Sequence, residues 1–129
     1  ANRHRVQVTS PRAVAEMLLP LYGNRPVEQF GVVSLDTKHR VMRTTVVTIG
    51  TLDASIVHPR EVFREAAAGG AAAIIVFHNH PSGDPEPSKD DVELTHRLIA
   101  AGVLMGIDVL DHVILGNVRY CSMKEERYI

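Results

Sequence analysis

The spacing of hydrophobic and polar positions in the first part of the chain predicts one helix followed by a β-hairpin. Ser10 and Pro11 form a typical helix start, a capping side chain followed by a proline that needs no amide donor. Apolar residues then recur at helical spacing as far as Gly23, which can end the helix. Two β-branched runs, residues 27–36 and 41–50, flank a short polar stretch and predict an antiparallel hairpin.

A second helix and a buried strand are predicted after the hairpin. His58 and Pro59 open a helix with one apolar face, and Gly69 and Gly70 stop it. Residues 71–77, AAAIIVF, are apolar at every position. Such a run is typical of a central strand that is covered on both faces.

The rest of the chain predicts a third helix and a final group of strands. The helix covers residues 88–101 and is closed by Gly102. Residues 107–123 then contain two or three strands, with a turn at Gly116 and Asn117. Helices before, between and after strands of mixed pairing favour an α/β (α+β layered) domain, in which helices flank a central mixed β-sheet.

Size and composition fit a single globular domain. The chain has 129 residues, of which 45% are hydrophobic and 22% are charged, enough for one core and too few for two ordinary domains. A formal net charge of -1 gives no strong attraction to DNA or to an anionic membrane. The single cysteine, Cys121, fits a reducing compartment. Residues 71–77 are too few to cross a bilayer and no secretory signal is visible, so we expect a cytoplasmic location.

The stretch HNHPSGDPEPSKDD, residues 78–91, turns polar directly after the buried strand and contains a candidate metal site. His78 and His80 are two positions apart, so their side chains share a face in an extended chain. Paired imidazoles suit zinc, which takes about three protein ligands in a catalytic site and keeps a fourth position open. Asp91 lies on the face of the third helix that we expect to be buried. An acid there needs a partner, which makes Asp91 the candidate third ligand.

A purely structural interpretation competes with the metal site. Ser88 and Asp91 also fit a capping box, and for these two residues alone capping is the favoured interpretation. The loop between the histidines and Ser88 has an ordinary turn composition, and a pair of histidines near a turn is usually not a metal site. Spacing alone favours the two interpretations equally.

The same residues resemble the JAMM motif of the JAB1/MPN metalloprotease superfamily, in which His-x-His-Pro is followed by Ser and then Asp. His78, His80, Ser88 and Asp91 match that motif in type and spacing. The segments HNHPSGDP, HPREVFREA and DHVILG are more specifically similar to the bacterial RadC family. The resemblance covers nearly the whole chain and implies the JAB1/MPN fold, with a cytidine-deaminase-like architecture. We expect residues 1–129, which begin without Met, to be one JAMM domain from the C-terminal part of a longer RadC-family protein.

The resemblance also implies roles for particular residues. His78, His80 and Asp91 would bind Zn2+. Glu28 matches a superfamily glutamate that relays the proton of the attacking water, and Ser88 would donate a hydrogen bond to the oxyanion. From the residues alone, Glu28 shares a strand face with apolar neighbours and points inward, although a solvated strand start is nearly as well supported.

The implied reaction is hydrolysis of a peptide or isopeptide amide in a peptide or protein substrate by metal-activated water. Asn79 stands where ubiquitin-cleaving relatives usually have Ser or Thr, so a ubiquitin substrate is not implied. The alternative is a non-catalytic, metal-containing interaction module of a RadC protein associated with DNA repair. Any contact with nucleic acid is then expected through a separate N-terminal region, because this domain has no aromatic platform among basic residues.

Two other enzyme classes do not fit the sequence. The letters HNH are adjacent here, whereas HNH nucleases spread their residues over a longer unit. A zinc deaminase needs His-x-Glu and Pro-Cys-x-x-Cys, and the chain has neither. Asp111 and His112 could contact the metal ligands, but satisfying local backbone or a partner surface is the favoured interpretation for both.

Overall fold

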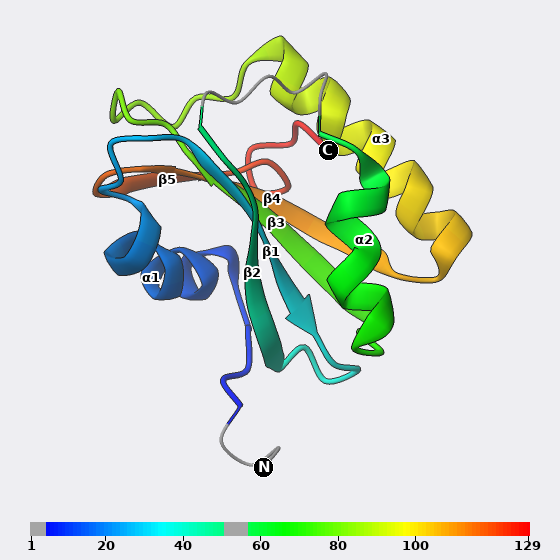
Figure 1. The fold of residues 1–129 in the computed structure, drawn as a ribbon. Coiled ribbons are helices and arrows are strands. Elements are labelled where there is room, and N and C mark those ends of the chain that lie inside the picture. Colours follow the sequence, from blue (N-terminus) through cyan, green and yellow to red (C-terminus); the bar gives the residue numbers. More distant parts are fainter. Residues whose placement is uncertain (1–4, 51–56) are drawn as a thin grey trace.

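A computed structural model describes residues 5–50 and 57–129 of the chain, so Ala1 and Asn2 at its start lie outside the described part. One five-stranded sheet, in the order β2-β1-β3-β4-β5, forms the centre of the fold (Figure 1). The elements in chain order are α1 (Pro11–Tyr22), β1 (Gln29–Leu35), β2 (Val41–Ile49), α2 (Pro59–Ala68), β3 (Ala73–Asn79), α3 (Lys89–Met105), β4 (Asp108–Gly116) and β5 (Arg119–Ser122).

Mixed strand pairing confirms the predicted fold class. β1 pairs antiparallel with both β2 and β3, and β4 pairs antiparallel with β5. β3 and β4 are parallel, with α3 as the crossover between them. The predicted hairpin is confirmed, and so is the turn before β5, where Asn117 adopts a positive φ of 63°.

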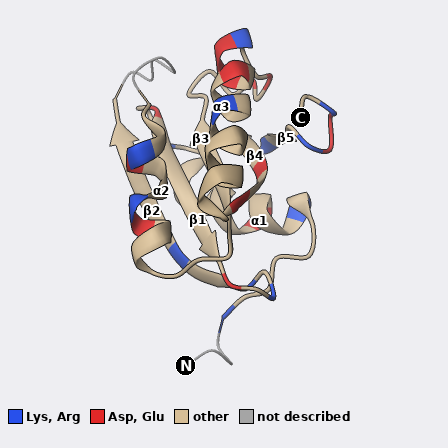
Figure 2. Ribbon diagram, turned by 90° about the vertical axis from the view of Figure 1, so that its right-hand side faces the viewer, with Lys and Arg blue, Asp and Glu red and all other residues tan. Residues whose placement is uncertain are grey.

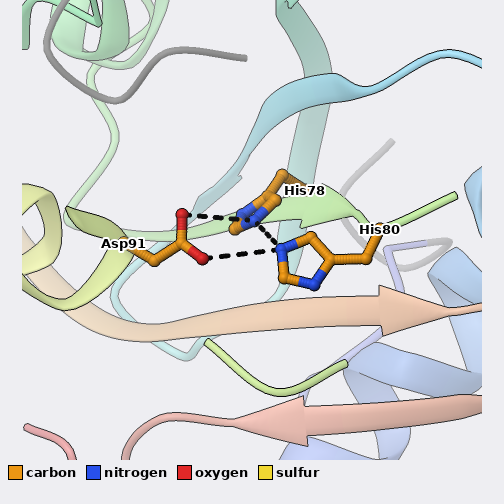
Figure 3. Close-up of side chains that lie close together, drawn as sticks. All are labelled: His78, His80 and Asp91. Carbon is orange, nitrogen blue, oxygen red and sulfur yellow. Dashed lines mark hydrogen bonds and ion pairs between the residues drawn. The ribbon is translucent and has the colours of Figure 1, made fainter. Parts of the chain in front are cut away.

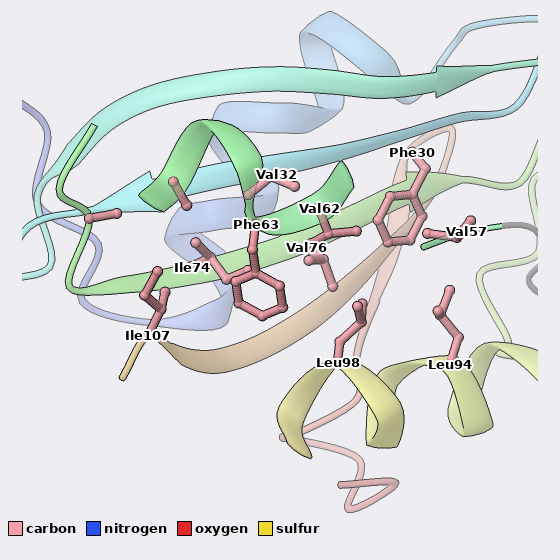
Figure 4. Close-up of a cluster of buried hydrophobic side chains, with 12 residues drawn as sticks. Phe30, Val32, Val57, Val62, Phe63, Ile74, Val76, Leu94, Leu98 and Ile107 are labelled. Carbon is pink, nitrogen blue, oxygen red and sulfur yellow. The ribbon is translucent and has the colours of Figure 1, made fainter. Parts of the chain in front are cut away.

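Two hydrophobic layers cover the two faces of the sheet, as predicted for a central strand buried on both sides. α1 packs on one face, while α2 and α3 cover the other (Figure 1). Along β3, Ile74 and Val76 contact the layer under α2 and α3, and Ile75 and Phe77 contact the layer under α1. The α2 and α3 layer is drawn in Figure 4. Each such side chain contributes about 1.5–3 kcal/mol to the free energy of folding when fully buried. These contacts hold β3 firmly in the sheet.

The predicted starts of the helices are confirmed, but the predicted end of the third helix is wrong. α3 continues through Gly102 to Met105 and ends at Gly106, which adopts the left-handed conformation with φ 71°. Gly102 serves packing instead, because a Cβ atom there would lie 2.3 Å from the carbonyl oxygen of Ile107. Spacing along the chain cannot distinguish a glycine that ends a helix from one that lets backbone approach it.

Charged residues of both signs are interspersed along the ribbon in Figure 2. Some of the basic side chains around the hairpin form ion pairs, with 2.8 Å between Arg40 Nε and Asp36 Oδ2 and 2.6 Å between Arg43 and Glu65. These pairs agree with the small net charge of -1. Within the described part of the chain, every helix is too short or too polar to cross a membrane.

Candidate metal centre

The carboxyl end of β3 presents both histidines of the motif. His78 is fully buried within β3, opposite Phe30 of β1, and His80 follows one residue after the strand. The backbone N–H of His80 donates to the carbonyl oxygen of Leu115 at 2.8 Å, which holds the chain against β4 beyond the end of β3. The two imidazoles lie on one side of the chain, as the spacing predicts (Figure 3).

Asp91 reaches the histidines from the first turn of α3. Its backbone N–H donates to Ser88 Oγ at 3.0 Å, and its Oδ2 accepts from the Ser88 N–H at 2.9 Å. The capping box is therefore confirmed. Asp91 is also buried, with 6% of its surface exposed, as predicted from its helix face. The Asp91 side chain therefore both caps α3 and lies beside the two histidines.

One nitrogen from each imidazole and both carboxylate oxygens of Asp91 converge at this point. His78 Nε2 lies 3.6 Å from Asp91 Oδ1, and His80 Nε2 lies 3.5 Å from Asp91 Oδ2. The two Nε2 atoms are 2.8 Å apart. One candidate ligand atom from each of the three residues lies within 4.8 Å of the other two, which places them within reach of a single ion. His78, His80 and Asp91 could therefore hold a metal ion.

The electrostatics of this cluster favour a cation. Burial alone would raise the pKa of Asp91, but the neighbouring imidazoles of His78 and His80 outweigh burial and hold that pKa far below its usual range. The hydrogen bond with Asp91 raises the pKa of His80 above its usual 6.5, although burial opposes that shift. An anionic carboxylate facing two imidazoles is a donor set that zinc, among the common metal ions, binds well.

Glu28 lies near the cluster. It immediately precedes β1, is half-buried, and its charge is one of the causes that raise the pKa of His80. The antiparallel register pairs Phe30 with His78, so continuing it by two residues brings Glu28 level with His80. The sheet thus brings Glu28 to the end at which the histidines lie.

Asn79 has a structural role that the sequence analysis missed. It is fully buried, and its Oδ1 accepts a hydrogen bond from the Gln29 N–H at 2.7 Å. Its Nδ2 donates to the carbonyl oxygens of Val27 at 3.1 Å and Arg25 at 3.3 Å. Asn79 therefore ties the segment that carries Glu28 to the strand that carries the histidines. The sequence does contain one signal for this role of Asn79, namely a polar residue between two histidines at the end of a buried strand.

His112 does not have the role that the sequence favoured. It is fully buried on β4, and its Nε2 lies 2.7 Å from His78 Nδ1. For Asp111 the favoured interpretation is confirmed, because its carboxylate accepts from the backbone N–H groups of His112 and Lys124 and from the Ser122 hydroxyl. The local sequence Asp-His does not show which of the two side chains lies on the same face of the sheet as His78, since this depends on the register of a parallel pair.

Two other residues of potential chemical interest lie outside this cluster. His58 is the N-cap of α2. Cys121 is a buried thiol, and burial raises its pKa to about 11, so it carries no thiolate at neutral pH.

Comparison with known proteins identifies the family. A family model described as RadC-like JAB domain matches residues 8–128. A UPF0758 protein of Methanosarcina mazei is 46% identical over 95% of this chain and 54% of its own length. UPF0758 proteins of Symbiobacterium thermophilum and Bacillus cereus are 50% and 44% identical over 97% and 98% of this chain, covering 53% and 56% of their own lengths. The chain thus spans about half the length of these relatives, and it belongs to the RadC-like JAB domain family.

Proposed function

We propose that the domain is a zinc-dependent hydrolase of the JAMM type that cleaves a peptide or isopeptide amide. The observation that carries this proposal is the convergence of His78, His80 and Asp91, whose nitrogen and oxygen atoms lie 2.8–3.6 Å apart at the end of a buried strand. Zinc bound there would polarise the substrate carbonyl and lower the pKa of water to about 7.

Residues around the candidate ligands supply the base and the hydrogen-bond donor that the proposed reaction needs. Glu28, whose charge acts on His80, accepts the proton of the attacking water and passes it to the leaving amine. Ser88 uses an oxygen lone pair to accept the Asp91 N–H, so its hydroxyl proton is available to the oxyanion. Asn79 holds the Glu28 segment against β3 and fixes the base relative to the ligands.

The proposed partner of the site is a peptide or protein. Lys, Arg, Asp and Glu are mixed over the described part of the fold, and a net charge of -1 gives no strong overall attraction to a phosphate backbone. Any contact with nucleic acid is proposed to be made by a region that corresponds to the part of the relatives that this chain does not span. We propose a cytoplasmic location, in keeping with the single cysteine.

A metal-containing interaction module without turnover is the second candidate. The observation that favours it is the depth of the ligands, because the exposed fractions of the side chains are 1% for His78, 8% for Asp91 and 19% for His80. A structural metal is enclosed in this way, whereas a catalytic metal keeps one position open to substrate. Turnover decides between the two candidates.

The proposed function is tested by metal content and peptide hydrolysis. Protein made without a histidine tag or chelator is expected to contain about one zinc per chain, and His80→Ala is expected to lose it. Zinc-loaded protein should cleave members of a peptide library, and chelation should stop the cleavage until zinc is restored. Zinc without cleavage would favour the interaction module. A parent chain that takes up no added zinc would exclude both.

Zinc affinity is expected to fall as the pH is lowered from about 8 to about 6. The hydrogen bond with Asp91 raises the pKa of His80, so protons compete for Nε2 at a higher pH than in a free histidine. Below that pKa the affinity should fall about tenfold per pH unit. Competition with a chromophoric chelator at several pH values measures this dependence. An affinity that stays constant across the range would show that His80 is not a ligand.

A further inference from the structure

Behind the candidate ligands, a second buried imidazole supports His78. His112 Nε2 lies 2.7 Å from His78 Nδ1, on the opposite side of the His78 ring from Asp91 and His80. Phe30 stacks on His78 with an interplanar angle of 17° and meets His112 edge-on at 82°. The His78 ring is therefore held by one hydrogen bond and one aromatic face.

Thr95 continues the contact from His112 into α3. Thr95 Oγ1 lies 2.6 Å from His112 Nδ1 and 2.7 Å from the backbone carbonyl oxygen of Asp91, one turn earlier. The carbonyl has no proton, so at 2.7 Å the Thr95 hydroxyl must donate to it. Because a hydroxyl has one proton, Thr95 Oγ1 can only accept from His112.

Counting protons along this chain fixes the tautomer of each ring. His112 donates its Nδ1–H to Thr95. The ring is fully buried, which disfavours its charged form, so it is neutral and its Nε2 is a bare acceptor. His78 must then donate its own Nδ1–H to His112. The remaining nitrogen, His78 Nε2, has a lone pair, to which His80 Nε2–H donates across 2.8 Å in the metal-free chain.

We infer that Thr95 and His112 are positioning residues, which hold His78 as the Nδ1–H tautomer with its Nε2 lone pair directed at the metal position. The chain of hydrogen bonds begins at the Asp91 carbonyl and ends at His78, so it joins two of the three candidate ligands through α3, β4 and β3. The expected effect on zinc affinity rests on the proposed function, whereas the assignment of the His78 tautomer does not depend on it.

The tautomers are measured first, on metal-free parent protein with 15N-labelled histidine. Long-range proton–nitrogen correlation spectra, assigned with single histidine substitutions, should show the Nδ1–H form for both His78 and His112. A His78 ring with its proton on Nε2 would overturn the inference. This measurement needs no metal, so it gives a result even if the chain proves not to bind zinc and the proposed function fails.

A matched pair of variants then tests the role of the Thr95 hydroxyl. Thr95→Val keeps the shape and removes the hydroxyl, and is expected to weaken zinc binding about 10–100-fold. Thr95→Ser keeps the hydroxyl and should bind zinc within about threefold of the parent. Thermal unfolding of the metal-free proteins shows whether each variant is folded. Equal zinc affinity in the parent and a folded Thr95→Val would overturn the inference, and if that variant fails to fold, the tautomer spectrum of the parent decides.

Discussion

Asp91→Asn is expected to weaken zinc binding about a thousandfold while α3 stays folded. A structural zinc site in a peptide binds with about 10–16 kcal/mol, and the loss of one ligand in three removes about 4 kcal/mol. The asparagine oxygen can still accept from the Ser88 N–H, so the helix cap remains. Chelator competition measures the affinity, and circular dichroism measures the helix.

Ser88→Ala is the matched control for this variant. It removes the hydroxyl that accepts the Asp91 N–H at 3.0 Å and leaves the carboxylate in place. We expect it to lower the free energy of unfolding by about 1 kcal/mol and to retain zinc. If Asp91→Asn lost only stability and kept its zinc affinity, capping would be the whole role of Asp91 and the metal site would be wrong.

Glu28→Gln is expected to reduce kcat about 10²–10⁴-fold with zinc still bound. The substitution removes the carboxylate that accepts the proton of water. It leaves the backbone carbonyl of residue 28, which accepts the Gly50 N–H at 2.9 Å. Cleavage of the best peptide from the library, measured beside the zinc content of the same sample, separates loss of the base from loss of the metal.

The control for Glu28→Gln is Glu86→Gln, which makes the same change of charge at an exposed position of the loop before α3. Its kcat should stay close to that of the parent. A similar loss in both variants would indicate a general effect of charge rather than a specific proton transfer. Full activity in Glu28→Gln would remove Glu28 from the mechanism.

Local features of the structure were predictable because the patterns that specify them are local. Ser10 caps α1 and His58 occupies the N-cap position of α2, so both helices begin where predicted. His78, His80 and Asp91 lie within one short stretch of sequence, so a strand end and a helix start are sufficient to bring them together. The hairpin also follows from two runs joined by a short turn.

The contacts made by Thr95 and His112 could not be predicted from the sequence. They depend on the parallel register that places Val76 beside His112, between two strands separated by the whole of α3. A threonine on the buried face of a helix is equally compatible with plain core packing. Only the tertiary arrangement shows that Thr95, on α3, forms a hydrogen bond with His112 on β4.

The capping bond at Asp91 also has a consequence for which ions the site can select. Asp91 Oδ2 already accepts from the Ser88 N–H at 2.9 Å, so the helix cap restricts how far the carboxylate can turn to adapt to a large ion. Ca²⁺ takes about six to eight oxygen ligands, often with bidentate carboxylates, and Mg²⁺ prefers oxygen over imidazole. Two imidazoles beside one carboxylate that is tied to the helix cap therefore disfavour Ca²⁺ and Mg²⁺ before affinity for zinc is considered.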